Sequence, residues 1–428
     1  MRVYYYGVME RIDYILDFCK ELGKQMIASG ANIERVNLSI EKICHAYGLH
    51  DVTCANLTTR ISISAKDENK RYAHRQTDVP PQVFNLERLK KLNNLSYEVR
   101  DHTPDVTTLY DLLHSVKSND FPWWVMMIGY LLAMAGLARI FSANPAELLI
   151  SELNTLILFG FSKLFSKVHI TKIITNFLCM FVCSAIAMLF YRMGFVKNFF
   201  IVIITNAFFL IPGIQMVNCA RNLLCGNEMN GVIDLLKVFI EVCTIVAGVA
   251  AAYAVFGGVV NYATLESMDS RGPAAGQEFL FNLELVALTL LASTGFSIVF
   301  NIQLKDLGFA AIGGAIVRIV YILCKLAIPY YFVITVIAAF CAALYSEILA
   351  NIRKEPSTLY LYPSVVPLIP GDLFYYAGLG IVWGNVEYIK NYGPNLALSL
   401  AGISLGFVLC STIVHYVRKF KFLKVSKD

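Results

Sequence analysis

Apolar positions along the chain change their pattern near residue 120. Up to Asp120 they recur at helical spacing or alternate with polar residues, as in half-buried strands. From Phe121 onward they merge into long apolar blocks, which we place at residues 121–141, 146–166, 170–191, 197–217, 235–256, 279–300, 305–326, 327–349, 358–380 and 395–417. Each block is close to the roughly 20 residues that a helix needs to cross a bilayer. The pattern therefore predicts ten transmembrane helices.

The first 120 residues predict a small α/β domain. Apolar residues at helical spacing predict helices over Ile12–Ala28 and Asn32–Tyr47, which Ser29-Gly30 and Gly48 end. The β-branched stretch Val52–Ser64 predicts strands. Thr77–Pro81 reads as a turn. Two further helices are expected over Val83–Ser96 and Val106–Ser118.

Composition agrees with a membrane protein. Of the 428 residues, 57% are hydrophobic and only 16% are charged, against about 25% charged in soluble domains. We therefore divide the chain into a cytoplasmic domain (1–120), a first five-helix module (121–256), a connecting loop (257–278), a second module (279–417) and a basic tail (418–428). The tail directly follows a span, so we interpret it as a lipid-facing anchor and not as a nucleic-acid site.

A constant shift relates the two modules. The sequence Leu-Ile-Pro-Gly occurs at Leu210 and again at Leu368, and 368 − 210 = 158. Adding 158 to the first five blocks gives the second five within a few residues. The same shift pairs Gly226, Asn227 and Gly248 with Gly384, Asn385 and Gly406. The chain is predicted to contain an internal repeat.

Five spans per repeat is an odd number. The second copy must then enter the membrane from the opposite side, so the sequence predicts two inverted repeats. Inverted repeats are a common plan of secondary transporters, whose substrate site lies at the repeat interface near the bilayer midplane.

Lysine and arginine predict the orientation. With the N-terminus inside, the outer loops hold Arg192, Lys197, Arg271 and Lys390, and the inner loops and the tail hold the larger share. Both termini are therefore expected in the cytoplasm, with the chain in the plasma membrane.

The two Pro-Gly pairs predict interrupted helices. Such a break frees backbone groups, and the next helix begins with N–H groups that bind a carboxylate. The alternative is a simple kink or an end at the membrane surface. The candidate substrate-binding residues are Pro212, Gly213, Gln215, Asn218, Pro370, Gly371 and Asp372. Asp372 either caps its helix, meets a substrate ammonium or carries a proton.

Charged residues inside the blocks are candidates for coupling. Arg318 lies well inside the seventh block and needs a partner or water; Asp372, Glu347, Glu284 and Glu241 are the candidate partners. Glu241 also lies four residues after Lys237, and Glu347 lies near Arg353, so local pairs are an alternative for both. Glu284 and Glu152 are possible proton carriers.

Other classes of site find no support in the sequence. His45, His50 and Cys54 fit no metal-binding spacing, and no phosphate-binding GxxxxGK[ST] occurs. No nucleophile or metal cluster suggests a membrane enzyme. We therefore expect no catalytic residue, no metal and no cofactor.

Four stretches resemble the threonine/serine exporter family. Gly23–Leu49 (GKQMIASGANIERVNLSIEKICHAYGL) resembles its opening signature, and Cys54–Ser64 (CANLTTRISIS) resembles the strand that follows. LIPG at Leu210 and PLIPG at Pro367 resemble its membrane motifs. The layout is also similar, with a cytoplasmic domain and two five-span modules fused in one chain. Where the family often has an acidic residue about nine positions after the first Pro-Gly, this chain has Arg221-Asn222.

The resemblance implies efflux of small hydrophilic amino acids coupled to the proton motive force, with protons as the coupling ion of an antiporter. Alternating access is the expectation from the inverted repeats. Export of a dicarboxylate such as succinate, or an uncoupled solute channel, remains an alternative. The expected partners are the small-molecule substrate, protons and membrane lipid, with a homo-oligomer possible and no nucleic acid.

Overall fold

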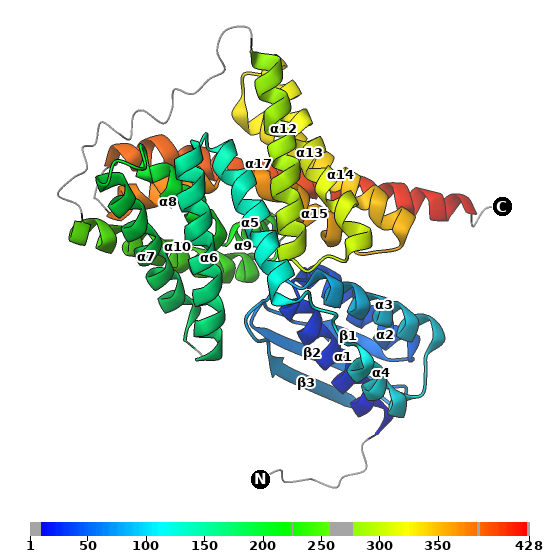
Figure 1. Ribbon diagram of the computed structural model, residues 1–428. Coiled ribbons are helices and arrows are strands. Elements are labelled where there is room, and N and C mark those ends of the chain that lie inside the picture. Colours follow the sequence, from blue (N-terminus) through cyan, green and yellow to red (C-terminus); the bar gives the residue numbers. More distant parts are fainter. Residues whose placement is uncertain (1–9, 169, 225, 257–276, 383–385, 426–428) are drawn as a thin grey trace. The chain divides into compact units, whose positions relative to one another are not determined.

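The computed structural model describes residues 10–168, 170–224, 226–256, 277–382 and 386–425 (Figure 1). The chain forms two compact units. The first holds the N-terminal 120 residues together with the short segments 300–302 and 354–359, and the second holds the other residues. Most of the expected 257–278 loop, at residues 257–276, lies outside the described part. The side chains of the 418–428 tail also lie outside the described part. The backbone of the tail continues as helix to Val425.

The first unit is a three-stranded antiparallel sheet with helices. Its elements are α1 (Arg11–Ala28), α2 (Ile33–Ala46), β1 (His50–Cys54), β2 (Arg60–Lys66), β3 (Tyr72–Asp78), α3 (Leu86–His102), the short 3-10 helix η1 (Val106–Thr108) and α4 (Leu109–Ser115). Ile61, Ile63 and Ala65 of β2 are buried, and α1 packs against β2 and β3. The alternation of buried and polar residues on β2 is that of a strand with one covered face. The four predicted helices are thus confirmed, although the last is a single short turn followed by two helical turns.

The second unit consists of helices. Its first half contains α5 (Trp123–Ile140), α6 (Pro145–Lys167), α7 (Lys172–Arg192), α8 (Phe199–Leu210), α9 (Gly213–Leu224) and α10 (Glu228–Phe256). Its second half contains α12 (Glu278–Val299), α13 (Leu304–Ala327), α14 (Tyr331–Arg353), α15 (Thr358–Val365), the 3-10 helix η2 (Val366–Leu368), α16 (Gly371–Val382) and α17 (Val386–Val425).

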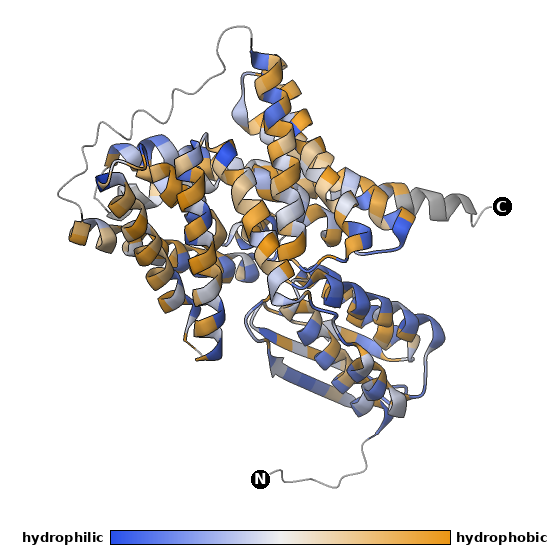
Figure 2. Cartoon of the chain, in the orientation of Figure 1, coloured by the Kyte–Doolittle hydropathy of each residue, from blue (hydrophilic) through white to orange (hydrophobic). Residues whose placement is uncertain are grey.

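Eight of these helices are long and apolar enough to cross a membrane: α5, α6, α7, α10, α12, α13, α14 and α17. Their hydrophobic residues stand out in Figure 2. The chain is therefore a multi-pass membrane protein. The two predicted blocks without an uninterrupted helix are the two that contain Leu-Ile-Pro-Gly. The first is the pair α8 and α9, bent by 58°, and the second is the series α15, η2 and α16.

Helix boundaries in the two halves repeat at an almost constant offset. The helix that follows each break begins at a glycine, and 371 − 213 = 158. The helices after that begin at Glu228 and Val386, again 158 apart (386 − 228 = 158). For α6, α7 and α8 the offset of the helix start is 159 (304 − 145, 331 − 172 and 358 − 199).

Helix packing repeats as well. A methyl group added at Gly248 of α10 would lie 2.6 Å from the carbonyl oxygen of Phe177 on α7. A methyl group at Gly406 of α17 would lie 2.6 Å from the carbonyl oxygen of Val336 on α14. These positions correspond (406 − 248 = 158 and 336 − 177 = 159). Glycine is needed at both because only a residue without Cβ lets membrane helices approach this closely.

The two halves meet through α5 and α12, which lie side by side (Figure 1). A methyl group at Gly136 would lie 2.7 Å from the backbone nitrogen of Ala292, and Gly295 approaches the backbone nitrogen of Ala133 in the same way. These pairs are reciprocal, since 295 − 136 = 159 and 292 − 133 = 159. Because residue numbers rise along one helix as they fall along the other, α5 and α12 are antiparallel.

A second reciprocal contact joins the halves. The short helix α9 of the first half packs against α17 of the second, where Ser404 Oγ donates to the carbonyl oxygen of Val217 at 3.4 Å. Conversely, α16 of the second half packs against α10 of the first, and a methyl group at Gly378 would lie 2.7 Å from a methyl of Val246. Each broken helix therefore completes the packing of the opposite half.

Candidate functional site

The two helix breaks contact each other. A methyl group at Gly213, where α9 begins, would lie 2.9 Å from the terminal methyl of Ile369 in the second break. A methyl group at Gly371, where α16 begins, would lie 2.5 Å from the ring of Phe208 near the end of α8. The two Leu-Ile-Pro-Gly sequences thus meet inside the helical unit.

The first N–H group of each resuming helix already has an acceptor. The Gly213 N–H donates to the carbonyl oxygen of Ile211 at 2.8 Å, and the Gly371 N–H donates to that of Ile369 at 2.8 Å. An anion would have to compete with these local bonds. The main role of the breaks is therefore to shape the space between the two halves. Their first N–H groups are not free to bind a substrate.

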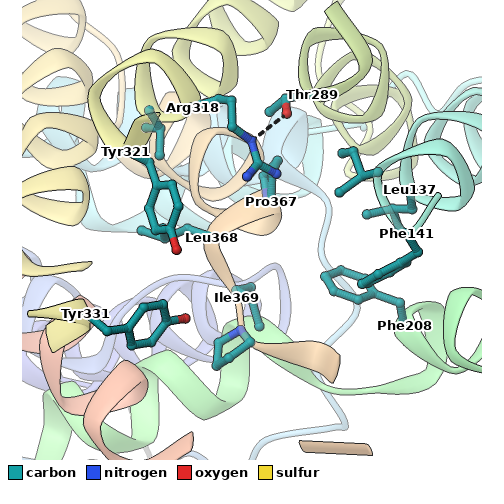
Figure 3. A pocket seen from close by; sticks show the side chains of 13 residues that line it. Leu137, Phe141, Phe208, Thr289, Arg318, Tyr321, Tyr331, Pro367, Leu368 and Ile369 are labelled. Atoms are coloured by element: carbon teal, nitrogen blue, oxygen red, sulfur yellow. Dashed lines mark hydrogen bonds between the residues drawn. The ribbon is translucent and has the colours of Figure 1, made fainter. Parts of the chain in front are cut away.

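A cavity of about 270 Å³ lies beside the second break. Residues Pro367 to Pro370 form one part of its wall, and α5, α8, α12, α13 and α14 supply the rest. In Figure 3, Leu137, Phe141 and Phe208 face the cavity on one side, and Arg318, Tyr321 and Tyr331 face it on the other. One wall is thus apolar and the other carries the polar groups.

Arg318 is the charged residue of this cavity. It is the fifteenth residue of α13, a membrane-length helix. Its Nε donates to Thr289 Oγ1 on α12 at 3.0 Å, and its guanidinium lies 5.9 Å from the ring centroid of Tyr321. Among the described residues, no carboxylate lies within 4.0 Å of the guanidinium nitrogens. Because a guanidinium has five N–H donors, the remaining ones are available for a ligand in the cavity.

Two tyrosines complete the polar wall. Tyr321 lies one helical turn after Arg318 on α13, and Tyr331 begins α14. The Tyr331 hydroxyl lies 3.3 Å from Ser399 Oγ on α17. Figure 3 shows the Tyr321 ring on the side of the guanidinium and the Tyr331 ring farther from it, near Ile369. A planar cation flanked by phenol groups suits a carboxylate, which accepts several hydrogen bonds.

The equivalent place in the first half is filled by aromatic rings. Arg318 and Thr289 correspond to Phe159 and Tyr130, because 318 − 159 = 159 and 289 − 130 = 159. The Tyr130 ring packs edge-on against Phe159 at 5.4 Å between centroids, and it stacks on Phe209 at 5.0 Å. The hydrogen-bonded pair Arg318 and Thr289 of the second half therefore corresponds to the aromatic pair Phe159 and Tyr130 of the first half.

The structure places the predicted site residues in different surroundings. Pro370 lines the Arg318 cavity. Asn218 lines a much smaller space of about 10 Å³ together with Arg221. The Oε1 atom of Gln215 is buried without a hydrogen-bond partner. The side chain of Asp372 lies outside the described part of the chain.

Two of the acidic candidates, Glu284 and Glu241, pair with cations other than Arg318. Glu284 pairs with Arg139 of α5 at 2.8 Å, and Glu241 pairs with Lys172 of α7 at 2.8 Å. Glu347 is half-buried on α14. Its proposed neighbour Arg353 pairs with Asp306 at 2.7 Å.

Three polar residues of the cavity, Thr289, Tyr321 and Tyr331, were not predicted from the sequence. Tyr321 carried a usable signal, because a residue three positions after Arg318 shares its helix face. Thr289 and Tyr331 carried none, since they come from other helices and only packing brings them to Arg318. In the described part of the chain, no cluster of three or more His, Cys, Asp or Glu side chains could hold a metal ion.

Two family models match the sequence. One, described as "Putative threonine/serine exporter", matches residues 17–256. The other, described as "Threonine/Serine exporter, ThrE", matches residues 285–413. The chain belongs to the threonine/serine exporter family. Comparison with curated proteins and with solved structures finds no match.

The family assignment covers both parts of the architecture. The first match includes most of the N-terminal unit and the helices α5 to α10, and the second covers nearly all of α12 to α17. Members of this exporter family are transporters. The Arg318 cavity is therefore a candidate substrate site of a membrane exporter.

Proposed function

We propose that the chain exports small amino acids of the threonine/serine type and binds the substrate carboxylate at Arg318. The observation that carries this proposal is the guanidinium inside a membrane-length helix, which faces a cavity and has no carboxylate partner among the described residues. A buried cation without a counter-ion is costly, and in membrane proteins it marks a substrate or ion pathway. A substrate carboxylate would supply the missing charge.

The size of the cavity favours a small solute. Sites for drug-sized ligands usually measure about 300–1,000 Å³, and this cavity measures about 270 Å³. Its mixed wall suits an amino acid with a short side chain. The carboxylate would meet Arg318, and the rest of the molecule would contact Leu137, Phe141 and Phe208.

We further propose that the halves are inverted repeats and that access alternates between them. Support comes from the reciprocal contact of α5 and α12, which are equivalent helices and antiparallel. A two-fold axis that exchanges two antiparallel helices is perpendicular to both. For helices that cross a bilayer, that axis lies in the membrane plane, as in inverted-repeat transporters. Counting each broken series as one span would give ten spans, an even number, so both termini would lie on the same side of the membrane. We propose that this side is the cytoplasmic face of the plasma membrane, as the lysine and arginine distribution predicts.

Transport in liposomes tests the function. We expect the purified full-length chain to catalyse counterflow of labelled threonine or serine, in which unlabelled substrate inside drives transient uptake of label. An imposed pH gradient should increase the accumulation. Counterflow of succinate with no counterflow of threonine or serine would instead favour the dicarboxylate alternative. Equilibration of label without counterflow would indicate a channel and contradict alternating access.

A further inference from the structure

The helix α6 carries a carboxylate without a partner. Glu152 is the eighth residue of this helix, so it lies about 10 Å along the axis from the helix start, at a rise of about 1.5 Å per residue. Both of its carboxylate oxygens are buried and have no hydrogen-bond partner. An ionised carboxylate in such a place costs several kcal/mol, so the group is neutral in this arrangement.

Four other acidic residues of the helical unit, Glu147, Glu241, Glu284 and Asp306, have partners. Glu147, one turn earlier on α6, accepts hydrogen bonds from the backbone nitrogens of Asn144 at 2.8 Å and Asn198 at 2.9 Å. Asp306 pairs with Arg353, and both Glu241 and Glu284 have cationic partners. Within the described chain, Glu152 stands apart as the carboxylate whose two oxygens are both buried and unpartnered.

The helices packed against α6 offer Glu152 no counter-ion. They are α5, α7 and α8. Their charged residues are Arg139 on α5 and Lys172 and Arg192 on α7; the first two already pair with Glu284 and Glu241, and Arg192 ends its helix. The uncharged titratable groups are Tyr130 on α5 and Cys179, Cys183 and Tyr191 on α7, and α8 has none. On α6 itself, Glu147 is hydrogen-bonded, Lys163 lies over the rings of Trp123 and Phe159, and Lys167 ends the helix.

Several buried polar groups of α6 and α7 also lack hydrogen-bond partners. Ser151 Oγ and Asn154 Oδ1 on α6 and Ser184 Oγ on α7 are buried without hydrogen-bond partners. Asn154 also donates to Asn206 Oδ1 of α8 at 3.1 Å. Buried groups of this kind are commonly satisfied by water. Water held between α6, α7 and α8 would be a source for the proton that Glu152 exchanges.

The second half lacks this polar set. An offset of 159 places Ala311 at the position of Glu152, and it places Ala310, Gly313 and Ala343 at the positions of Ser151, Asn154 and Ser184. Arg318, conversely, has Phe159 as its counterpart in the first half. The two halves thus carry different chemistry, with a carboxylic acid in one and a cation in the other.

We propose that Glu152 carries the coupling proton of this exporter, while Arg318 holds the substrate. In the arrangement described here Glu152 is protonated. When the halves rearrange and water reaches it, the acid releases its proton to that water, and the carboxylate later takes a proton from the other side of the membrane. This inference rests on the proposed function and adds the site of the coupling ion.

The variant Glu152→Gln tests the assignment in liposomes that contain the full-length chain. Glutamine keeps the shape and neutrality of the protonated acid but cannot release a proton. We expect counterflow of labelled threonine without a pH gradient to stay within about threefold of the unsubstituted protein, because counterflow needs no net proton movement. Accumulation driven by a pH gradient should fall by at least about tenfold, which equals a loss of about 1.4 kcal/mol of coupling.

Glu284→Gln is the matched control. It makes the same change on a membrane-length helix, at a carboxylate that is half-exposed and paired with Arg139. It should keep accumulation driven by the pH gradient. If Glu152→Gln accumulates substrate as the unsubstituted protein does, Glu152 is not the proton carrier.

A second measurement tests the assignment if Glu152→Gln folds poorly. A pH-sensitive dye inside the liposomes reports proton movement during threonine transport by the unsubstituted protein and by Glu152→Asp, which retains an acid. Proton flux with altered pH dependence in Glu152→Asp supports the assignment, and unchanged pH dependence contradicts it. Absence of counterflow in the unsubstituted protein would count against the proposed function itself. Counterflow without any proton flux would contradict only the inference about Glu152.

Discussion

Arg318→Gln is expected to reduce counterflow of labelled threonine or serine roughly 10- to 100-fold. A hydrogen bond to a charged group contributes about 1.5–3 kcal/mol, and each 1.4 kcal/mol corresponds to a factor of ten. Glutamine removes the positive charge that would face the substrate carboxylate and leaves only a neutral amide. The initial rate of counterflow, normalised to the amount of inserted protein, measures the effect.

Arg139→Gln is the control for this change. Arg139 is also an arginine on a membrane-length helix, but it pairs with Glu284 and donates to the carbonyl oxygen of Ala143 at 2.8 Å, and it does not line the cavity. Its replacement should leave counterflow within about threefold of normal, as expected for a pair exposed at the helix surface. Arg318→Lys should be intermediate, because lysine keeps the charge but loses the planar fork. Normal counterflow in Arg318→Gln would remove Arg318 from the substrate site.

Gly371→Leu is expected to abolish most transport while the protein still inserts into the membrane. A methyl group at this position would already lie 2.5 Å from the ring of Phe208, which lines the cavity. A leucine side chain must push the two breaks apart or turn Phe208 into the cavity. Such overpacking costs about 1–3 kcal/mol, so we expect counterflow to fall by about tenfold or more.

Gly308→Leu separates this effect from the general cost of a larger side chain in a helix. Gly308 lies near the start of α13, and nothing lies within 4 Å of a methyl group built there. We expect near-normal counterflow and an unchanged elution profile in detergent. Equal loss of transport in both variants would mean that the contact between the breaks is not specific to function.

The sequence was sufficient to locate the breaks, and its 158-residue shift matches the offset of 158 to 159 at which helix starts recur in the structure. Proline at 212 and 370 removes a backbone donor, and each following glycine begins the next helix. Because these effects are local, they can be read from single residues. The same holds for the helix ends in the N-terminal unit, such as Gly48, which adopts a φ of 80° where α2 ends.

Strand β3 was not predicted, because its inward positions look polar. Ala73, Arg75 and Thr77 alternate on the side that faces the helices, and only Ala73 is apolar. Arg75 is satisfied by Asp13 and Asp17 of α1, at 2.6 Å and 3.1 Å. The pattern cannot reveal such a strand, since the partners that make it possible lie about 60 residues away.

The residues that line the cavity could not be predicted from the sequence, for a related reason. Arg318 was recognised as a charge that needs a partner, but its hydrogen bond to Thr289 and the presence of Tyr331 in the same cavity depend on how α12, α13 and α14 pack. Two of the four carboxylates proposed for it pair with other cations, Glu284 with Arg139 and Glu241 with Lys172. Long-range pairing of this kind follows from the three-dimensional arrangement of the spans and leaves no local pattern.

The central claim is that Arg318 binds the substrate carboxylate. It is tested most directly by measuring the binding of threonine and of threoninamide to the purified unsubstituted protein and to Arg318→Gln. Threoninamide keeps the ammonium and the side chain but replaces the carboxylate by a neutral amide. Isothermal titration calorimetry should show that the unsubstituted protein prefers threonine by at least about tenfold, a difference of about 1.4 kcal/mol. In Arg318→Gln that preference should disappear. The same preference in both proteins would show that the carboxylate is bound elsewhere.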